Sequence, residues 1–359
     1  MAVSKTRDER AGWLRDHLEG RAVLSGTGQP GAVESRLLLG VLLRGAARQE
    51  AGLELSEFEA RMVDSLEHWL DREEVDSFGR IYSEVAEKRG LAGVFPQAVT
   101  GLALAEPYTE ETFRKDLAQV PDMSQRSDVQ VVDLAKGGQD AIAAPNERGG
   151  SRYSTTIVTS SDAVPAAAPG PTRIQARRLE CVQDTDEATS DEIYFAVATA
   201  SDLGHKRQVR TQEYGSFDTG DNRHISSDPF FDGRYNKTIT LSIAAWEADD
   251  SGSGFYNEMD KKLPLIADAL WNAAVALEPY PVGQWESLAE WIKVGSMITT
   301  IINWLIDALR NDDDFIEERT IVLDHAAIEK YKRDANLSWW WFRGDGARYR
   351  FYLNVWDPS

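Results

Sequence analysis

The sequence predicts an α+β protein built from three parts. These are an N-terminal helical domain over residues 1–118, a linker over residues 119–171, and a C-terminal antiparallel β-sandwich over residues 172–359 with a helical hairpin inserted at about 260–310. Three observations lead to this prediction. Apolar residues recur at helical spacing in the first third, the composition then shifts to Ala, Gly, Pro and Ser, and the apolar period afterwards becomes two.

The helical domain has a clear start signal at Ser56. The run Ser56-Glu57-Phe58-Glu59 has the form of a capping box, in which a Ser and a Glu three residues later satisfy each other's backbone N–H groups. Apolar side chains then follow on one helical stripe at Phe58, Met62 and Leu66. We therefore expect an amphipathic helix that begins directly after Ser56.

The predicted linker contains two stretches with few large apolar residues, "AKGGQDAIAAPNERGG" and "SSDAVPAAAPGPT". Such a composition is typical of a flexible tether, because little apolar surface is available to offset the entropy lost on ordering. The segment "YSTTIVT" at residues 153–159 leaves a second interpretation open, namely one strand laid onto a neighbouring sheet.

The strands of the predicted sandwich are indicated by a period of two. Apolar side chains occupy alternate positions in several runs, each with smaller or polar side chains between them: residues 193–197, 239–245, 321–323 and 349–355. Strands with one apolar face belong to antiparallel sheets that cover a core on one side. Several such strands joined by polar turns predict a β-sandwich.

A helical pattern interrupts these strands between about residues 260 and 310, with Pro279 and Pro281 at the expected turn. Ile298, Ile302 and Leu305 lie close to one stripe of the second helix. This hairpin has two interpretations. Its apolar stripe packs on the sandwich, or it is a releasable segment that inserts into a membrane or oligomerises.

The net charge and the cysteine count exclude several kinds of partner and site. The chain has 359 residues and a formal net charge of −20, with 59 acidic against 39 basic residues. Such a surface repels phosphate backbones, so we expect no nucleic-acid partner. Cys181 is the only cysteine, which excludes an intramolecular disulfide and a thiolate metal cluster.

The sequence pattern predicts a protein that is cytoplasmic as synthesised. The N-terminal residues carry charges from Lys5 onward and show no apolar core of a Sec signal peptide. The longest charge-free apolar run, "VGSMITTIINWLI", has 13 residues, whereas a bilayer-spanning helix needs about 20. Export by a route without a signal peptide stays open.

Signatures of catalysis are few. The five histidines are dispersed and form no metal-binding pair, and no nucleophile elbow occurs. Cys181 lies inside a predicted strand, where a small buried thiol is the expected role. The sequence therefore favours a non-enzymatic protein. A metal-dependent enzyme with a carboxylate site stays open only because acidic residues are plentiful.

Acidic side chains gather in two predicted loops. Asp184, Asp186 and Asp191 lie at the join between two strands, and Glu247 and Asp249 follow a later strand. Calcium takes six to eight oxygen ligands, mostly carboxylates, and loops at one end of a sandwich can supply them together. We therefore predict a calcium site from these five residues if the two loops share an end. The alternative is a pair of solvated acidic turns.

The runs "SDEIYFAV" and "LSIAAWEADD" resemble the synaptotagmin-like calcium- and lipid-binding β-sandwich modules, over about residues 172–250. The resemblance implies Asp191 as a first-loop ligand with Asp184 or Asp186 as its partner, and Glu247 and Asp249 as the later acidic pair. It also implies a lipid-facing basic patch on one strand, formed by Lys206, Arg207 and Arg210.

Trp339, Trp340 and Trp341 are followed by Phe342, which gives four consecutive aromatic side chains. Alternate residues of a strand point to opposite faces, so these four cannot all face one core. We expect one or two of them to be exposed as a stacking surface for a sugar or as a membrane-interface wedge, or to cover the inserted helices.

These observations predict a non-enzymatic binding protein. Its β-sandwich recognises a surface on a protein, a glycan or a membrane, with calcium as the expected cofactor if the acidic loops converge. The helical domain provides attachment or oligomerisation, and a homo-oligomer is left open. The alternative is a toxin or effector delivered without a signal peptide, in which the inserted hairpin is the membrane-active element.

Overall fold

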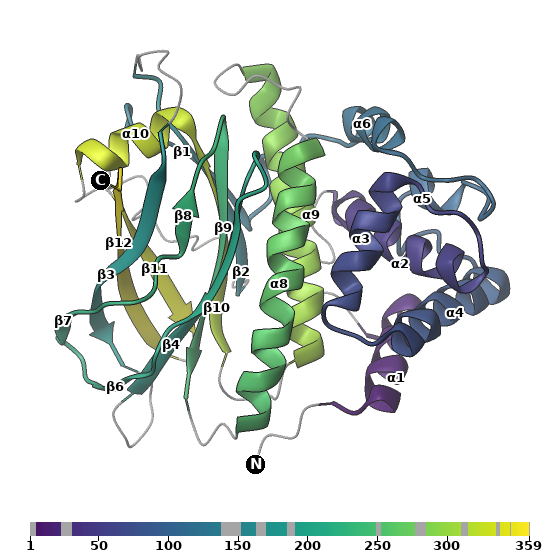
Figure 1. Ribbon diagram of the computed structural model, residues 1–359, viewed down its shortest axis with the longest axis horizontal. Coiled ribbons are helices and arrows are strands. Elements are labelled where there is room, and N and C mark those ends of the chain that lie inside the picture. The colour runs from purple at the N-terminus through teal and green to yellow at the C-terminus, as the bar shows by residue number, and fades with distance from the viewer. Residues whose placement is uncertain are drawn as a thin grey trace.

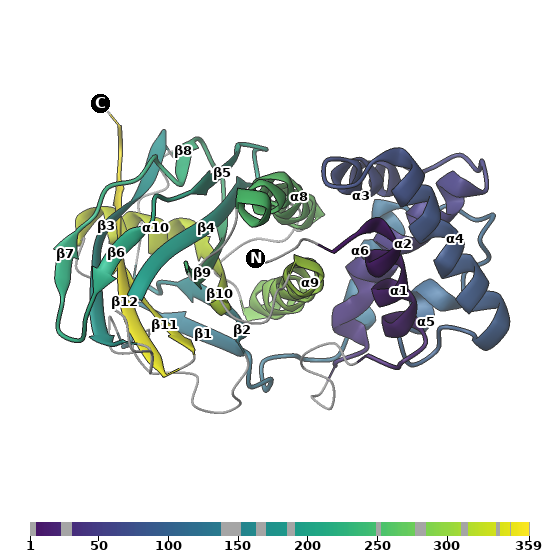
Figure 2. The same ribbon diagram turned by 90° about the horizontal axis from the view of Figure 1, so that it is seen from below.

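The computed structural model describes residues 5–22, 31–137, 152–162, 170–184, 191–248, 253–276, 285–309, 315–334, 338–344 and 346–358. It confirms the α+β class. The elements lie in layers, and the order of the layers is the same in both ribbon views (Figures 1 and 2): a smaller β-sheet, a larger β-sheet, the helices α8 and α9, and the N-terminal helices.

The N-terminal layer consists of helices, and four of them begin after a side-chain N-cap at Thr6, Ser56, Asp71 or Thr109. Its elements are α1 (Arg7–Leu18), η1 (Glu34–Arg36), α2 (Leu37–Glu50), α3 (Glu57–Glu67), α4 (Arg72–Arg89), α5 (Gln97–Thr100) and α6 (Glu110–Gln119). The capping box predicted at Ser56 is confirmed, since Ser56 Oγ accepts the Glu59 N–H and Glu59 accepts the Ser56 N–H, both at 3.1 Å. The buried Glu59 carboxylate also accepts from Arg44 at 2.7 Å.

The larger sheet has the order β1-β2-β10-β9-β4-β5, with β6 also paired to β4. The bounds of its strands are β1 (Val129–Asp133), β2 (Tyr153–Thr159), β4 (Asp191–Ser201), β5 (Lys206–Arg210), β6 (Tyr214–Phe217), β9 (Thr238–Glu247) and β10 (Phe315–Asp324). β1 pairs with β2, and β2 with β10, in parallel. The larger sheet is therefore mixed, whereas the sequence predicted antiparallel strands throughout.

The smaller sheet has the order β11-β12-β3-β7, and β8 also pairs with β3. Its strands are β3 (Thr172–Gln183), β7 (Asn222–His224), β8 (Phe231–Gly233), β11 (Trp339–Gly344) and β12 (Ala347–Trp356). Apolar side chains from both sheets form one buried cluster, in which Phe195 of β4 stacks on Phe351 of β12 with ring centroids 4.1 Å apart. Helix α10 (His325–Arg333) adds Ile328 and Tyr331 to this core.

The range 119–171 differs from the flexible tether that the sequence predicts, because β1 and β2 lie within it. Every residue of β2 except the last is buried, and the strand pairs with both β1 and β10. The interpretation of residues 153–159 as a strand laid onto a sheet is thus confirmed. The Ala- and Gly-rich stretches that suggested a tether fall largely outside the described residues.

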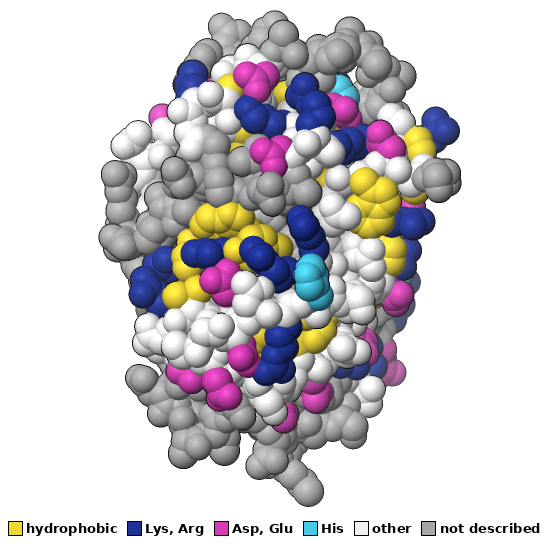
Figure 3. All heavy atoms as spheres, turned by 90° about the vertical axis from the view of Figure 1, so that its left-hand side faces the viewer, with side chains coloured by type: hydrophobic (Ala, Val, Ile, Leu, Met, Phe, Trp, Pro, Cys, Tyr) yellow, Lys and Arg dark blue, Asp and Glu magenta, His cyan; other side chains and the backbone are white. Residues whose placement is uncertain are grey.

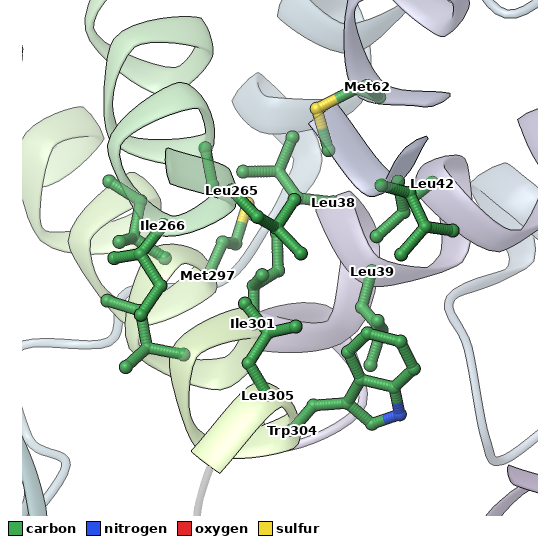
Figure 4. Packing of buried hydrophobic residues seen from close by; sticks show 14 of the residues in the cluster. Leu38, Leu39, Leu42, Met62, Leu265, Ile266, Met297, Ile301, Trp304 and Leu305 are labelled. Carbon is green, nitrogen blue, oxygen red and sulfur yellow. The ribbon is translucent and has the colours of Figure 1, made fainter. Parts of the chain in front are cut away.

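Helices α8 (Ser253–Ala276) and α9 (Trp285–Leu309) are inserted between the neighbouring strands β9 and β10. The turn at Pro279 and Pro281 lies outside the described residues. The two helices pack between the larger sheet and the N-terminal helices, and one continuous hydrophobic cluster joins all three layers. Figure 4 shows side chains of α9, among them Ile301 and Trp304, in this packing with Leu38 and Leu39 of α2.

This placement bears on the membrane interpretation of the hairpin. Ile302 and Leu305 are both 0% exposed, so the stripe identified from the sequence is used in packing. No helix in the described residues combines the length and the apolar character that crossing a bilayer requires.

Candidate functional site

The acidic residues of the predicted calcium site have different surroundings. Asp186 and Asp249 lie outside the described residues. Asp184 follows β3 and accepts hydrogen bonds from Thr219, at 2.8 Å from the hydroxyl and 3.3 Å from the N–H, and these bonds lower the Asp184 pKa. Asp191 opens β4, is fully buried, and accepts a hydrogen bond from the Tyr349 hydroxyl.

The structure brings two of these acidic positions to one end of the larger sheet. Ile193, two residues after Asp191, pairs with Glu247, the last residue of β9. The side chain of Glu247 is 6% exposed, and that of Asp191 is 0% exposed. Within the described part of the chain, no group of three or more His, Cys, Asp or Glu side chains is arranged to hold a metal ion.

Two of the three residues of the predicted basic patch on β5, Lys206 and Arg210, contact helix α8. Lys206 forms an ion pair with Asp268 and lies over the Trp271 ring, 4.7 Å from its centroid. Arg210 forms an ion pair with Asp260 at 3.2 Å, and Arg207 between them is half-buried. Two of the three cations thus bind carboxylates of α8 within the same chain, which leaves little free positive charge for a lipid surface.

The three consecutive tryptophans divide between the two faces of β11, as strand geometry requires. Trp340 is 1% exposed in the core between the sheets, so it is not a surface residue as the sequence suggested. Trp339 and Trp341 lie on the outer face with Tyr352 of β12. Their exposures are only 8% and 9%. The expectation of open stacking rings is therefore wrong, because arginine side chains cover these two rings.

Arginines and aromatic rings form a continuous surface on the outer side of the smaller sheet. We call it the arginine–tryptophan face, and it consists of Arg178, Glu180, Trp339, Trp341, Arg343, Arg348, Arg350 and Tyr352. It follows from the strand register. Trp341 pairs with Arg350, which pairs with Glu180, and Trp339 pairs with Tyr352, which pairs with Arg178.

Cation–π contacts hold the guanidinium groups of this face in place. The Arg350 guanidinium carbon lies 4.7 Å from the Trp339 ring centroid and 4.6 Å from that of Trp341. Arg343 lies 4.8 Å from the Trp341 centroid. The two indole rings meet edge to face, with centroids 5.7 Å apart. A cation over the face of a tryptophan is attracted by the ring quadrupole, so the arginine side chains are ordered before any ligand binds.

The arginine–tryptophan face carries net positive charge. Its one carboxylate, Glu180, accepts from Arg350 at 3.1 Å and from the Tyr352 hydroxyl at 2.9 Å. In the described part of the chain, no carboxylate lies within ion-pair distance of Arg178 or Arg348. Arg178 lies over Tyr352 at 3.6 Å, and Arg348 is exposed. Figure 3 shows this side of the molecule, where Lys and Arg side chains lie over hydrophobic ones.

Sequence reasoning identified the tryptophans and missed the arginines. The alternation around residues 348–352 places Arg348 and Arg350 opposite the core-facing Tyr349 and Phe351, and this was a usable signal. Comparison with protein-family models found no match to this chain, and comparisons with curated proteins and with solved structures found none either.

Proposed function

We propose that the protein is a non-enzymatic binding protein whose arginine–tryptophan face recognises an acidic segment of a partner protein. The observation that carries the proposal is a group of pre-ordered arginines with net positive charge, displayed by a chain whose formal net charge is −20. Association of oppositely charged surfaces is steered by such a local field. Guanidinium groups also bind carboxylates in two-point hydrogen bonds.

The covered rings and the acidic remainder of the chain favour this partner over the other surfaces predicted from the sequence. A glycan that stacks on tryptophan needs an open ring, and the rings of Trp339 and Trp341 are almost fully covered. A wide anionic membrane would also meet the acidic surface beyond the face. A short acidic segment touches only the arginines, and charges more than about 8 Å away are screened at physiological salt.

Charge reversal on the face tests the proposal. The probe is a fluorescein-labelled peptide that alternates Glu with Ala, and binding is followed by fluorescence anisotropy with the full chain. We expect the double variant Arg178→Glu, Arg348→Glu to bind at least tenfold more weakly, which corresponds to about 1.4 kcal/mol. The matched control, Lys88→Glu with Arg89→Glu on the exposed end of α4, is expected to change binding less than twofold.

Three outcomes would overturn this proposal. The first is no binding of the peptide to the wild-type chain, and the second is equal loss of binding in the two double variants. The third is binding of phosphatidylserine vesicles or heparin under conditions where the peptide does not bind. Binding that weakens steeply with added salt is expected, because the recognised charges lie at the surface.

Calcium remains a separate part of the proposal. The observation that favours it is that β4 begins and β9 ends at the same end of the larger sheet, which brings Asp191 and Glu247 onto neighbouring strands. A calcium ion there would offset the repulsion between carboxylates. Calorimetric titration with calcium is the test. An absence of heat, with no rise in melting temperature at millimolar calcium, would end this part.

The alternative function, an effector with a membrane-active hairpin, requires α8 and α9 to leave the layer in which they are packed. We place it second, because separating them from the N-terminal helices and the larger sheet would expose a large part of one hydrophobic cluster. Dye leakage from liposomes caused by the wild-type chain would support this alternative over the first proposal.

A further inference from the structure

A cavity of about 520 Å³ lies where β1, β2 and β10 end, in a different part of the molecule from the arginine–tryptophan face. These three strands are parallel, and their last residues, Asp133, Thr159 and Asp324, all line the cavity. The first turns of α9 supply part of the remaining wall. Ligands of open α/β sheets bind at the carboxyl ends of parallel strands, and small-molecule sites typically measure about 300–1,000 Å³.

Asp133, on one side of the cavity, already has several partners. It accepts the N–H of Ser161 at 2.9 Å and of Ala135 at 3.0 Å, and it forms an ion pair with Lys136 at 3.2 Å. Burial opposes ionisation of this group, but the backbone hydrogen bonds outweigh burial and lower the pKa of Asp133 to about 2. Asp133 is therefore a paired anion, whose charge Lys136 balances.

Asp324 is the second carboxylate of the cavity and has no cation to balance it among the ion pairs of the described residues. It caps helix α10 by accepting the Ala327 N–H at 2.7 Å, and it also accepts the Thr159 hydroxyl. Burial, with a smaller contribution from Asp133, raises the pKa of Asp324 to about 6. At neutral pH it is thus a buried anion that an added cation would stabilise.

Two buried polar groups on the cavity wall have no hydrogen-bond partner in the described part of the chain. They are the hydroxyl of Thr238, which is 0% exposed, and the indole N–H of Trp291, which is 4% exposed. Buried polar groups in folded proteins are almost always paired. An indole N–H only donates, so its missing partner must be an acceptor. A ligand that supplied polar atoms at this wall would give both groups a partner.

Most of the remaining described wall is apolar, and Ser124, Ser160 and Ser161 add three hydroxyl groups to it. Val131, Ile157 and Val322 come from the larger sheet, and Leu288 and Ile292 come from α9. Val131 is 38% exposed, and it is one of only two large hydrophobic side chains in the described residues with that much exposure. An apolar wall with a few convergent polar groups is the usual lining of a site for a small organic molecule.

We propose that this cavity binds a small organic cation: an amine with an apolar body and at least one oxygen acceptor. The ammonium group lies beside Asp324, where it balances the buried carboxylate. The acceptor oxygen takes the hydrogen bond of Trp291, and the apolar body packs against Val131, Ile157 and Ile292. The Thr238 hydroxyl then bonds to a second polar atom of the ligand.

Calorimetric titration of the full chain with four probes tests the proposal. The first probe, para-methoxyphenethylamine, carries both the amine and the ether oxygen, and phenethylamine lacks the oxygen. In para-methoxyphenylethanol a neutral hydroxyl replaces the amine, and in para-methoxyphenylacetate a carboxylate replaces it. We expect the methoxy amine to bind most tightly, and at least tenfold more tightly than the alcohol or the acid. No binding of either amine, or tighter binding of the acid, would overturn the proposal.

Two variants and one control locate the binding site and keep the test decisive. Asp324→Asn retains a helix-capping side chain and removes the charge, so both amines are expected to bind at least tenfold more weakly. Asp162→Asn, an exposed control near this end of the sheet, is expected to have no effect. Trp291→Phe is expected to weaken the methoxy amine and to leave phenethylamine unchanged. Equal effects of Trp291→Phe on both amines would also overturn the proposal, even if Asp324→Asn fails to fold.

Discussion

The buried carboxyl group of Glu318 should make the stability of the protein depend on pH. Its side chain is fully buried on the face of β10 that packs beneath α9. One carboxyl oxygen accepts from Ser242 at 2.8 Å and from Thr320 at 3.0 Å. The other has no hydrogen-bond partner in the described residues. Burial raises the pKa of Glu318 from an ordinary 4.5 to about 8.

The sign of the resulting pH dependence follows from these two values. Below pH 4.5 the group is protonated in both states and contributes no pH dependence. Between 4.5 and about 8 the unfolded chain releases a proton that the folded chain keeps, so the free energy of unfolding falls as pH rises. Each pH unit in this window costs about 1.4 kcal/mol, and the total at pH 8 is on the order of 4 kcal/mol.

Glu318→Gln removes the ionisation and keeps the size and the acceptor of the side chain. We therefore expect the difference in unfolding free energy between variant and wild type to shift in favour of the variant by roughly 3–4 kcal/mol from pH 5 to pH 8. Urea unfolding at several pH values, followed by circular dichroism, measures this difference. Glu87→Gln, on the exposed side of α4, is the control. A Glu318→Gln difference that is constant over this range would refute the reasoning.

Three further predictions concern packing. Gly79→Ala should destabilise the protein by about 1–3 kcal/mol, because its Cβ would lie against the Ala46 carbonyl group of α2, 2.6 Å from the carbonyl carbon. Gly12→Ala meets open space and should be neutral or stabilising, so equal melting temperatures of the two variants would contradict this prediction. Tyr349→Phe removes the hydroxyl that donates to buried Asp191 and should cost about 1–3 kcal/mol in urea unfolding; no loss would show that Asp191 has other sufficient partners. Ile302→Asp should prevent folding, as judged by circular dichroism, because it places a charge at a fully buried position. A folded variant would contradict this account of the packing, and if it still caused dye leakage from liposomes, the hairpin would not be the membrane-active element.

The strands with regular alternation could be predicted from the sequence, because one face of each covers the core between the sheets. In β4, Ile193, Phe195 and Val197 belong to that core. The intervening Ala196 and Ala198 are also buried, because α8 and α9 cover the opposite face. Small side chains on the second face were therefore the sign of a covering helical layer. A sheet with one solvent-exposed face would carry polar residues there.

The parallel pairing of β1, β2 and β10 could not be predicted. β10 follows β2 by more than 150 residues, and no turn signal links strands that far apart. The cavity depends on this pairing, since it alone brings Asp133, Thr159 and Asp324 together. The arginine–tryptophan face could not be predicted from the sequence for the same reason. Alternation places Trp339 and Trp341 on one side of β11, but only the cross-strand register brings Arg350 over them.

Cys181 provides an internal control that separates loss of binding from loss of structure. It lies in β3 with its side chain in the core, fully buried, while Arg178 and Glu180 of the same strand point outward. Burial, with nearby acidic groups, raises the pKa of the thiol to about 12, so the native protein should resist thiol reagents and react only when the smaller sheet opens. If Arg178→Glu with Arg348→Glu loses peptide binding and keeps the wild-type labelling rate, the arginines recognise the peptide directly. Faster labelling in that variant would instead mean that the substitutions disrupt the smaller sheet.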